Sequence, residues 1–177
     1  MPRFDSPLRA VALWDEAWCL RLNRASGVRW IRALFRAVSR LGDGVFWYVL
    51  MGGILLVHGR SAAGPVLRMA AVGVVGLALY KWLKKRTSRP RPYQIRAAIR
   101  LGADPLDQFS FPSGHTLHAV AFAVLMTAHH PPLGWLVWPF ALLVAASRVV
   151  LGLHYPTDVL AGAAIGAALA FAARLLT

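Results

Sequence analysis

The chain has 177 residues, 58% of them apolar and 15% charged, and its mean hydropathy is +0.53. This length has room for one domain, and the composition is unlike that of an average soluble protein. The formal net charge of +13 could suggest a nucleic-acid partner, but apolar stretches separate the basic residues and no nucleic-acid-binding motif occurs. Anionic lipid headgroups and phosphate substrates explain the charge better.

The amino-terminal region is predicted to form two helices, at residues 8–24 and 28–41, joined by a turn at 23–27. In the second helix, apolar residues fall near one face, and the arginines lie largely elsewhere. This pattern is typical of an amphipathic helix that lies in the membrane interface rather than crossing it. We therefore expect one domain, with interfacial helices in residues 1–42 and a membrane-embedded bundle in residues 43–177.

Five apolar runs follow, near residues 44–58, 63–83, 114–130, 133–151 and 157–176. Apart from the short first run, each approaches the roughly 20 residues that a helix needs to cross a bilayer. The fold class predicted is thus all-α, a polytopic transmembrane helix bundle with five spans. In the last run, Gly162 and Gly166 would let another helix approach closely, which favours a packing face within the bundle over a homodimer interface.

Three polar motifs lie at the ends of these runs. They are Lys84 with Arg91-Pro92 after six intervening residues, Pro112-Ser113-Gly114-His115, and Ser147-Arg148 followed by His154 and Asp158. If the spans alternate in direction, all three motifs fall on the same side of the membrane. Ionisable groups so close to hydrocarbon are costly, which favours a functional site.

The residue types in these motifs suit phosphoryl transfer. His154 and Asp158 stand four residues apart, so on a helix they share a face; a carboxylate on one imidazole nitrogen leaves the other free to attack. The phosphate oxygens need charge compensation, and the leaving oxygen needs a proton. The candidate phosphate ligands are Lys84, Arg91, Arg148, Ser113 and the amide of Gly114 at a helix start.

Together the motifs resemble the signatures of the type 2 phosphatidic acid phosphatase and vanadium haloperoxidase superfamily: Lys-x6-Arg-Pro, Pro-Ser-Gly-His and Ser-Arg-x5-His-x3-Asp. Every position matches, in order, over residues 84–158. The resemblance implies that His154 attacks phosphorus and forms a phosphohistidine, and that Asp158 orients His154. It implies that His115 protonates the leaving group and later activates water. It also implies that no metal or other cofactor takes part. Residues 39–44 look like the family's approach to its first span.

The apolar spans favour the membrane lipid phosphatase branch over the soluble haloperoxidases. We expect hydrolysis of a lipid phosphomonoester or diphosphate, such as undecaprenyl diphosphate, phosphatidic acid or phosphatidylglycerol phosphate. A phosphotransferase and a non-enzymatic lipid-binding or transport protein stay open as alternatives. A zinc pair of His115 and His118 is disfavoured, because no third ligand is suggested. Arg89 and Asp107 are interpreted as headgroup contacts.

The side of the membrane that carries the site is in conflict. Eight arginines precede residue 43 on the same side as the motifs, and by the positive-inside rule they point to the cytoplasm. The resemblance implies instead a bacterial inner membrane protein with its site at the outer face. Our expectation follows the resemblance.

Overall fold

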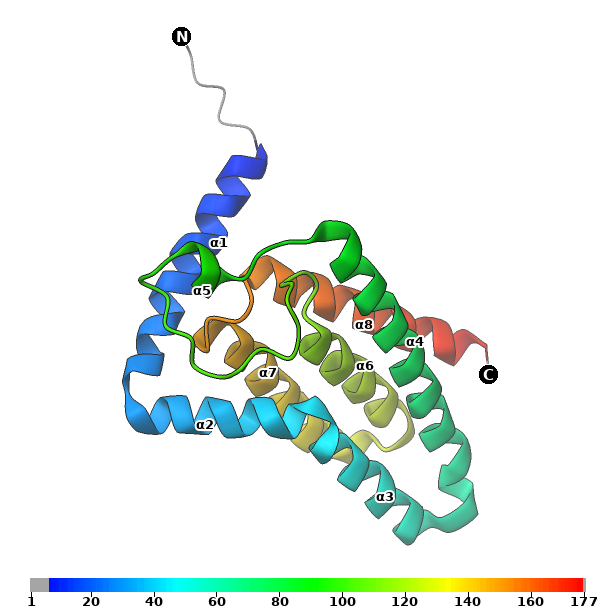
Figure 1. The fold of residues 1–177 in the computed structure, drawn as a ribbon. Helices are drawn as coiled ribbons and strands as arrows, with labels where there is room; N and C mark the ends of the chain where they lie inside the picture. Colours follow the sequence, from blue (N-terminus) through cyan, green and yellow to red (C-terminus); the bar gives the residue numbers. More distant parts are fainter. Residues whose placement is uncertain (1–6, 177) are drawn as a thin grey trace.

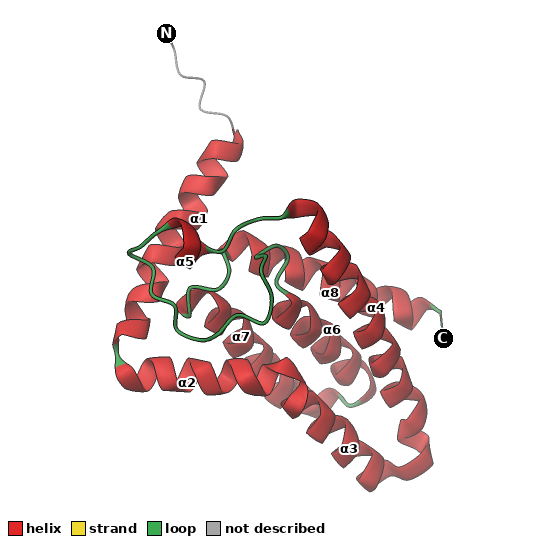
Figure 2. Cartoon of the chain, in the orientation of Figure 1, coloured by secondary structure: helices red, strands yellow, loops and turns green. Residues whose placement is uncertain are grey.

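The computed structural model describes residues 7–176, which form helices and connecting loops and contain no strand (Figures 1 and 2). The α-helices in this part are α1 (Pro7–Asn23), α2 (Arg29–Arg40), α3 (Phe46–His58), α4 (Ala63–Thr87), α5 (Pro92–Ile95), α6 (Gly114–His129), α7 (Gly134–Val150) and α8 (Pro156–Leu175). The predicted all-α class is confirmed. Residues 1–6 of the expected interfacial region lie outside the described residues.

The predicted elements agree closely with the helices. The two amino-terminal helices are α1 and α2, and the five apolar runs correspond to α3, α4, α6, α7 and α8. Three described helical stretches, Arg29–Ile95, Pro131–Val150 and Pro156–Leu175, are long and apolar enough to cross a membrane. Helix α6 has 16 residues and is shorter than a typical span. The number of five spans therefore stays a prediction.

Helix α6 lies at the centre of the bundle, packed against α4, α7 and α8 (Figure 1). Its residues are buried on nearly every side, so protein rather than lipid covers its apolar surface. The closest neighbour is α8, where a Cβ atom added at Gly162 or Gly166 would overlap a backbone carbonyl oxygen of Ser113 or Leu117. The two glycines thus form a packing face within the bundle, as the sequence predicts.

A sharp bend joins α2 to α3. The turn Leu41–Val45 contains Gly44 with a φ of +129°, a backbone conformation that residues other than glycine rarely adopt. Asp43 also departs from helical geometry. Beside it, Gly42 packs on Val144 of α7 with no room for a Cβ atom. The bend therefore fixes the start of α3 against α7 and brings Asp43 to the site end of the bundle.

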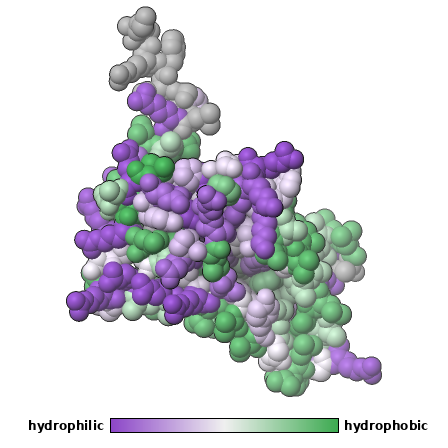
Figure 3. All heavy atoms as spheres, viewed as in Figure 1, coloured by the Kyte–Doolittle hydropathy of each residue, from purple (hydrophilic) through white to green (hydrophobic). Residues whose placement is uncertain are grey.

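Polar and apolar side chains separate along the molecule. In Figure 3 the polar ones gather over α1, α2 and the loop between α4 and α6, whereas apolar ones cover α3 and the lower part of α4. Large apolar side chains such as Leu56, Val57, Leu67 and Val74 are exposed there. A continuous apolar surface of this extent is suited to lipid and not to water. The loop end would then lie at the membrane–water boundary.

Candidate active site

The three motifs meet at the polar end of the bundle, around a cavity of about 340 Å³. Six of the eight predicted site residues line it: Lys84, Arg91, Gly114, His115, Arg148 and His154. The other two do not reach the cavity wall. Asp158 lies behind His154, and Ser113 is buried at the start of α6.

A tight turn after α7 positions His154. Gly152 has a φ of +73°, and a Cβ atom there would come within 2.7 Å of the carbonyl oxygen of Arg100. The chain then folds back, so that the amides of Leu153 and His154 both donate to the carbonyl oxygen of Arg148, each at 3.0 Å. This turn requires glycine, and it holds the buried imidazole against the end of α7.

The carboxylate of Asp158 lies beside one nitrogen of the His154 ring. Oδ2 of Asp158 accepts a hydrogen bond from the Tyr155 amide at 2.8 Å and is 3.6 Å from Nδ1 of His154. That separation exceeds a normal hydrogen bond, and Nδ1 has no other partner among the described residues. Such contacts are often long without substrate and tighten when it binds. The other nitrogen, Nε2, lies 3.4 Å from Nη1 of Arg91, one of the candidate phosphate-binding cations.

The three candidate phosphate cations are almost completely buried. Lys84 comes from the last turn of α4, Arg91 from the following loop and Arg148 from the last turn of α7. Burial, together with the charges of Arg148, Arg91 and Lys84, holds the pKa of His154 well below its usual value. The imidazole is therefore neutral at physiological pH, the form that a nucleophile needs.

An acidic residue whose role the sequence did not reveal bridges two of these cations. Oδ1 of Asp107 is 2.7 Å from Nζ of Lys84 and 2.7 Å from Nη2 of Arg91. Burial opposes ionisation of the carboxyl group, but the hydrogen bonds and charges of Lys84 and Arg91 outweigh it and keep the pKa of Asp107 below its usual value. The reading of Asp107 as a headgroup contact is thus replaced by a contact with the cations themselves.

His115, the predicted proton donor, lies in the first turn of α6 and lines the cavity. Its Nε2 is 3.5 Å from Oδ1 of Asp43 in the bend between α2 and α3. One turn along, Nε2 of His118 is 3.0 Å from the carbonyl oxygen of Gly73, which can only accept, so this nitrogen carries a proton. His118 therefore ties α6 to α4.

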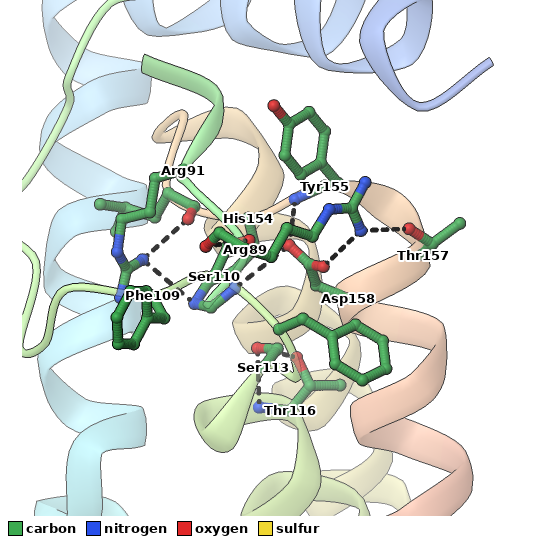
Figure 4. A network of polar contacts seen from close by, with 12 residues as sticks. Arg89, Arg91, Phe109, Ser110, Ser113, Thr116, His154, Tyr155, Thr157 and Asp158 are labelled. Atoms are coloured by element: carbon green, nitrogen blue, oxygen red, sulfur yellow. Dashed lines mark hydrogen bonds and ion pairs between the residues drawn. The ribbon is translucent and has the colours of Figure 1, made fainter. Parts of the chain in front are cut away.

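Ser113 occupies a structural position at the start of α6. Its Oγ accepts from the Thr116 amide at 3.5 Å and lies 3.0 Å from Oγ1 of Thr116 (Figure 4). Its own amide donates to the carbonyl oxygen of Asp158 at 3.0 Å. The residue caps α6 and holds it on α8, and its predicted role as a phosphate donor stays a prediction.

Arg89 is also placed differently from the sequence-based reading. Instead of reaching for a headgroup, its guanidinium contacts Asp158 and the buried Asp15 of α1, each at 2.7 Å. In the sequence, Arg89-Pro90 directly precedes Arg91-Pro92, and Asp15 is a carboxylate in the first predicted helix; neither feature indicates this pairing.

The apolar helical bundle and the buried cationic site define a class, that of integral membrane proteins with a site suited to phosphate groups. The chain belongs to the PAP2 superfamily, whose profile matches residues 65–177. The fold extends this match, since 94% of the chain superposes on 86% of a transmembrane PAP2-type phosphatidylglycerolphosphate phosphatase from Bacillus subtilis, with a TM-score of 0.75 and 28% identity.

Two relatives of similar sequence have names that refer to polyprenyl substrates. Undecaprenyl-diphosphatase BcrC from Bacillus subtilis (strain 168) is 29% identical over 127 residues, which cover 72% of this chain and 65% of that protein. Decaprenylphosphoryl-5-phosphoribose phosphatase from Mycobacterium tuberculosis (strain H37Rv) is 35% identical over 139 residues, which cover 76% of this chain and 74% of that protein. The chain thus spans about two thirds to three quarters of the length of these relatives.

Proposed function

We propose that the protein hydrolyses a terminal phosphate ester or diphosphate of a membrane lipid through a phosphohistidine intermediate. The observation that carries the proposal is a neutral imidazole, His154, beside a carboxylate and three buried cations in one cavity. Members of this superfamily with similar folds and sequences are phosphatases of lipid phosphates. The residue roles below belong to the proposal: the resemblance implies them, and the geometry of this chain supports them.

In the first step, Nε2 of His154 attacks phosphorus while the bond to the leaving oxygen breaks. The positive charge that develops on the ring is balanced by Asp158 at Nδ1, and His115 gives its proton to the departing alkoxide or phosphate. In the second step, His115 takes a proton from water, which attacks phosphorus and breaks the P–N bond. Throughout, Lys84, Arg91 and Arg148 offset the charge on the phosphate oxygens.

The shape of the cavity supports a lipid as the leaving group. Away from the cations its wall is apolar and comes from α3, α4 and α6; the residues are Trp47, Met51, Ala70, Val74, Leu77 and Phe122. Helices α3 and α4 carry large exposed apolar side chains, such as those of Leu56 and Leu67, which suits a position of this side of the cavity towards the membrane. A chain entering there would place its phosphate at the cations and its tail in hydrocarbon.

The experiment is a phosphate-release assay of the purified protein with a radiolabelled lipid phosphate. Wild type should release inorganic phosphate, and acid-labile label should be trapped on the protein. His154→Ala should lose both, because removal of a covalent nucleophile typically lowers turnover by several orders of magnitude. His130→Ala is the matched control, since His130 stacks on His58 at the other end of the bundle.

The alternatives predict different results in the same assay. A phosphotransferase would pass the label to a second lipid and release little inorganic phosphate. A binding or transport protein would retain lipid without turnover. Retention of more than about one per cent of activity by His154→Ala would remove that residue from the nucleophile role.

We also propose that the site lies at the outer face of the bacterial inner membrane. Helix α8 begins at the site, next to His154, and carries the chain towards the other end of the bundle (Figure 1). A reporter fused to the carboxyl terminus therefore reads sidedness directly. A cytoplasmic reporter would support an outer site, and an external one would overturn it and favour the positive-inside reading.

A further inference from the structure

We propose that Arg89 is a positioning residue that fixes the carboxylate of Asp158, and that Asp15 of the amino-terminal helix holds Arg89 in place. The inference rests on the proposed role of His154, because Asp158 acts through that ring. It adds two residues that are not among the fixed positions of the three motifs, one of them from a helix expected only to lie in the membrane interface.

The guanidinium of Arg89 lies against the oxygen of Asp158 that faces away from the histidine. Nη1 of Arg89 donates to Oδ1 of Asp158 at 2.7 Å and to Oγ1 of Thr157 at 2.9 Å (Figure 4). The other oxygen, Oδ2, is taken by the Tyr155 amide and faces His154. With one oxygen gripped by a cation and one by an amide, the carboxylate cannot rotate without breaking a charge-assisted hydrogen bond.

Asp15 anchors the other end of the guanidinium. Its side chain is fully buried, and its Oδ2 accepts from Nη2 of Arg89 at 2.7 Å. Its Oδ1 accepts from the Thr157 amide at 2.9 Å, and Oδ2 also accepts from the Thr157 hydroxyl. Arg89 thus bridges two buried carboxylates, which a planar fork can do and a single ammonium cannot. Breaking such a buried pair from one side leaves an uncompensated charge.

The arrangement makes α1 part of the catalytic scaffold. Asp15 ties α1 at once to the loop that carries Arg89 and to the first turn of α8, where Asp158 sits. The ring of Tyr155 supports the same guanidinium, whose central carbon lies 4.1 Å from the ring centroid. Arg89 itself does not line the substrate cavity, so we expect it to affect turnover rather than substrate binding.

Other charged and titratable groups also face His154 and Asp158. They are Arg91, Lys84 and Asp107 at the cavity, Arg148 of α7, His115 of α6, Cys19 and Asp15 of α1, Arg89 and Tyr155. A single replacement of Arg89 or Asp15 leaves every other group of this set unaltered, so a change in pH dependence can be assigned to the altered charge.

The test compares Arg89→Gln and Asp15→Asn with Glu16→Gln. Glu16 follows Asp15 in α1 and pairs with Arg96 at 2.7 Å in a more exposed position. Glu16→Gln therefore also removes one carboxylate of an ion pair in α1, but one that does not contact Arg89 or Asp158. We expect kcat to fall on the order of tenfold or more in Arg89→Gln and Asp15→Asn, with KM little changed, because a misplaced carboxylate misplaces the imidazole. Glu16→Gln should match wild type. Arg89→Lys, which keeps one charged contact, should recover part of the loss.

The pH profile separates positioning from mere structural support. Arg89→Gln removes a positive charge beside Asp158, so the acid limb of kcat/KM should move to higher pH. Asp15→Asn removes a negative charge and should move it to lower pH. Folding of each variant is checked by its thermal unfolding in detergent. Equal shifts in both variants, or wild-type turnover in Arg89→Gln, would overturn the proposal.

A double variant keeps this inference distinct from the proposed function. If Arg89 acts through Asp158, Arg89→Gln should reduce turnover no further in an Asp158→Asn background. Additive losses would overturn the positioning role even if His154 proved to be the nucleophile. An active His154→Ala variant would instead overturn the proposed chemistry, whatever the comparison of the single and double variants showed.

Discussion

The carboxylate of Asp107 and the ammonium of Lys84 are in direct contact, with 2.7 Å between Oδ1 and Nζ. The same oxygen is 2.7 Å from Arg91, so it sits where an oxygen of a bound phosphate would meet both cations. A substrate must displace this carboxylate or share the cations with it. We therefore expect Asp107 to lower the affinity of the site for anions.

Asp107→Asn should accordingly bind vanadate, a phosphate mimic, on the order of tenfold more tightly, because one negative charge next to the cations is removed. Inhibition constants for wild type and variant would show this. Asp104→Asn is a suitable control, since it neutralises a carboxylate of the same loop for which no contact with these cations is found. Weaker vanadate inhibition in Asp107→Asn would mean that the carboxylate instead holds Lys84 and Arg91 in position.

The pH dependence of the reaction should reflect the environment of His154. Because burial and three cations lower the pKa of this histidine, the neutral nucleophile persists at pH values below the usual histidine range. The acid limb of kcat/KM should thus lie below that range. In kcat, which reports the bound state, it should lie at higher pH, since the substrate's negative charge favours the protonated ring. An acid limb of kcat/KM above the usual range would contradict this account.

Metal independence is a further expectation, because Lys84, Arg91 and Arg148 can neutralise the phosphate without a divalent cation. Activity of the purified protein should survive an excess of chelator. Loss of activity on chelation, followed by its recovery with zinc or magnesium, would contradict this expectation. It would make His115 and His118 candidates for metal ligands again.

Close packing of α8 on α6 predicts a large effect of one methyl group. In Gly166→Ala the new Cβ atom would overlap the carbonyl oxygen of Leu117, so the helices must separate, which typically costs about 1–3 kcal/mol. Gly53→Ala in α3 provides the control, because no atom lies within 4 Å of the position of its Cβ. Thermal unfolding in detergent should show a lower Tm for Gly166→Ala alone. Equal Tm values would mean that α8 can shift without loss.

Much of the fold was predictable because the bilayer imposes it. Apolar runs of nearly fixed length gave α4, α7 and α8, and the alternation of spans was sufficient to bring the motifs together. The burial of α6 was less apparent, since a helix surrounded by protein and one surrounded by lipid are equally apolar. Short polar motifs at helix ends located His154, His115 and Asp158, because few other roles suit ionisable groups there.

The polar network behind the site could not be predicted in the same way. Asp15 and Asp107 belong to none of the three motifs and are separated in sequence from the residues they contact, and a carboxylate in a helix or loop is usually solvated. Their pairing with Arg89, Lys84 and Arg91 depends on how the 88–113 loop folds over the bundle. Four prolines, at positions 90, 92, 105 and 112, interrupt helical periodicity along that loop, so no local pattern specifies its course.

The last prediction concerns the geometry of Arg148. The side chain of Arg148 is buried and lines the cavity. Its Nη1 donates to Oγ of Ser39, whereas its Nε has no hydrogen-bond partner among the described residues. A guanidinium fixed in this way can offer two donors to one phosphate, whereas an ammonium is a single point charge.

Arg148→Lys keeps the charge and should still lower turnover on the order of tenfold or more, because the phosphate is no longer held in line with His154. The same replacement at Arg100 should be nearly silent, since that side chain is exposed and only its backbone is engaged, with Asn23. Kinetics of both variants on one short-chain lipid phosphate provide the measurement. Equal losses at the two positions would show that the site uses a general positive field rather than a shaped phosphate cradle.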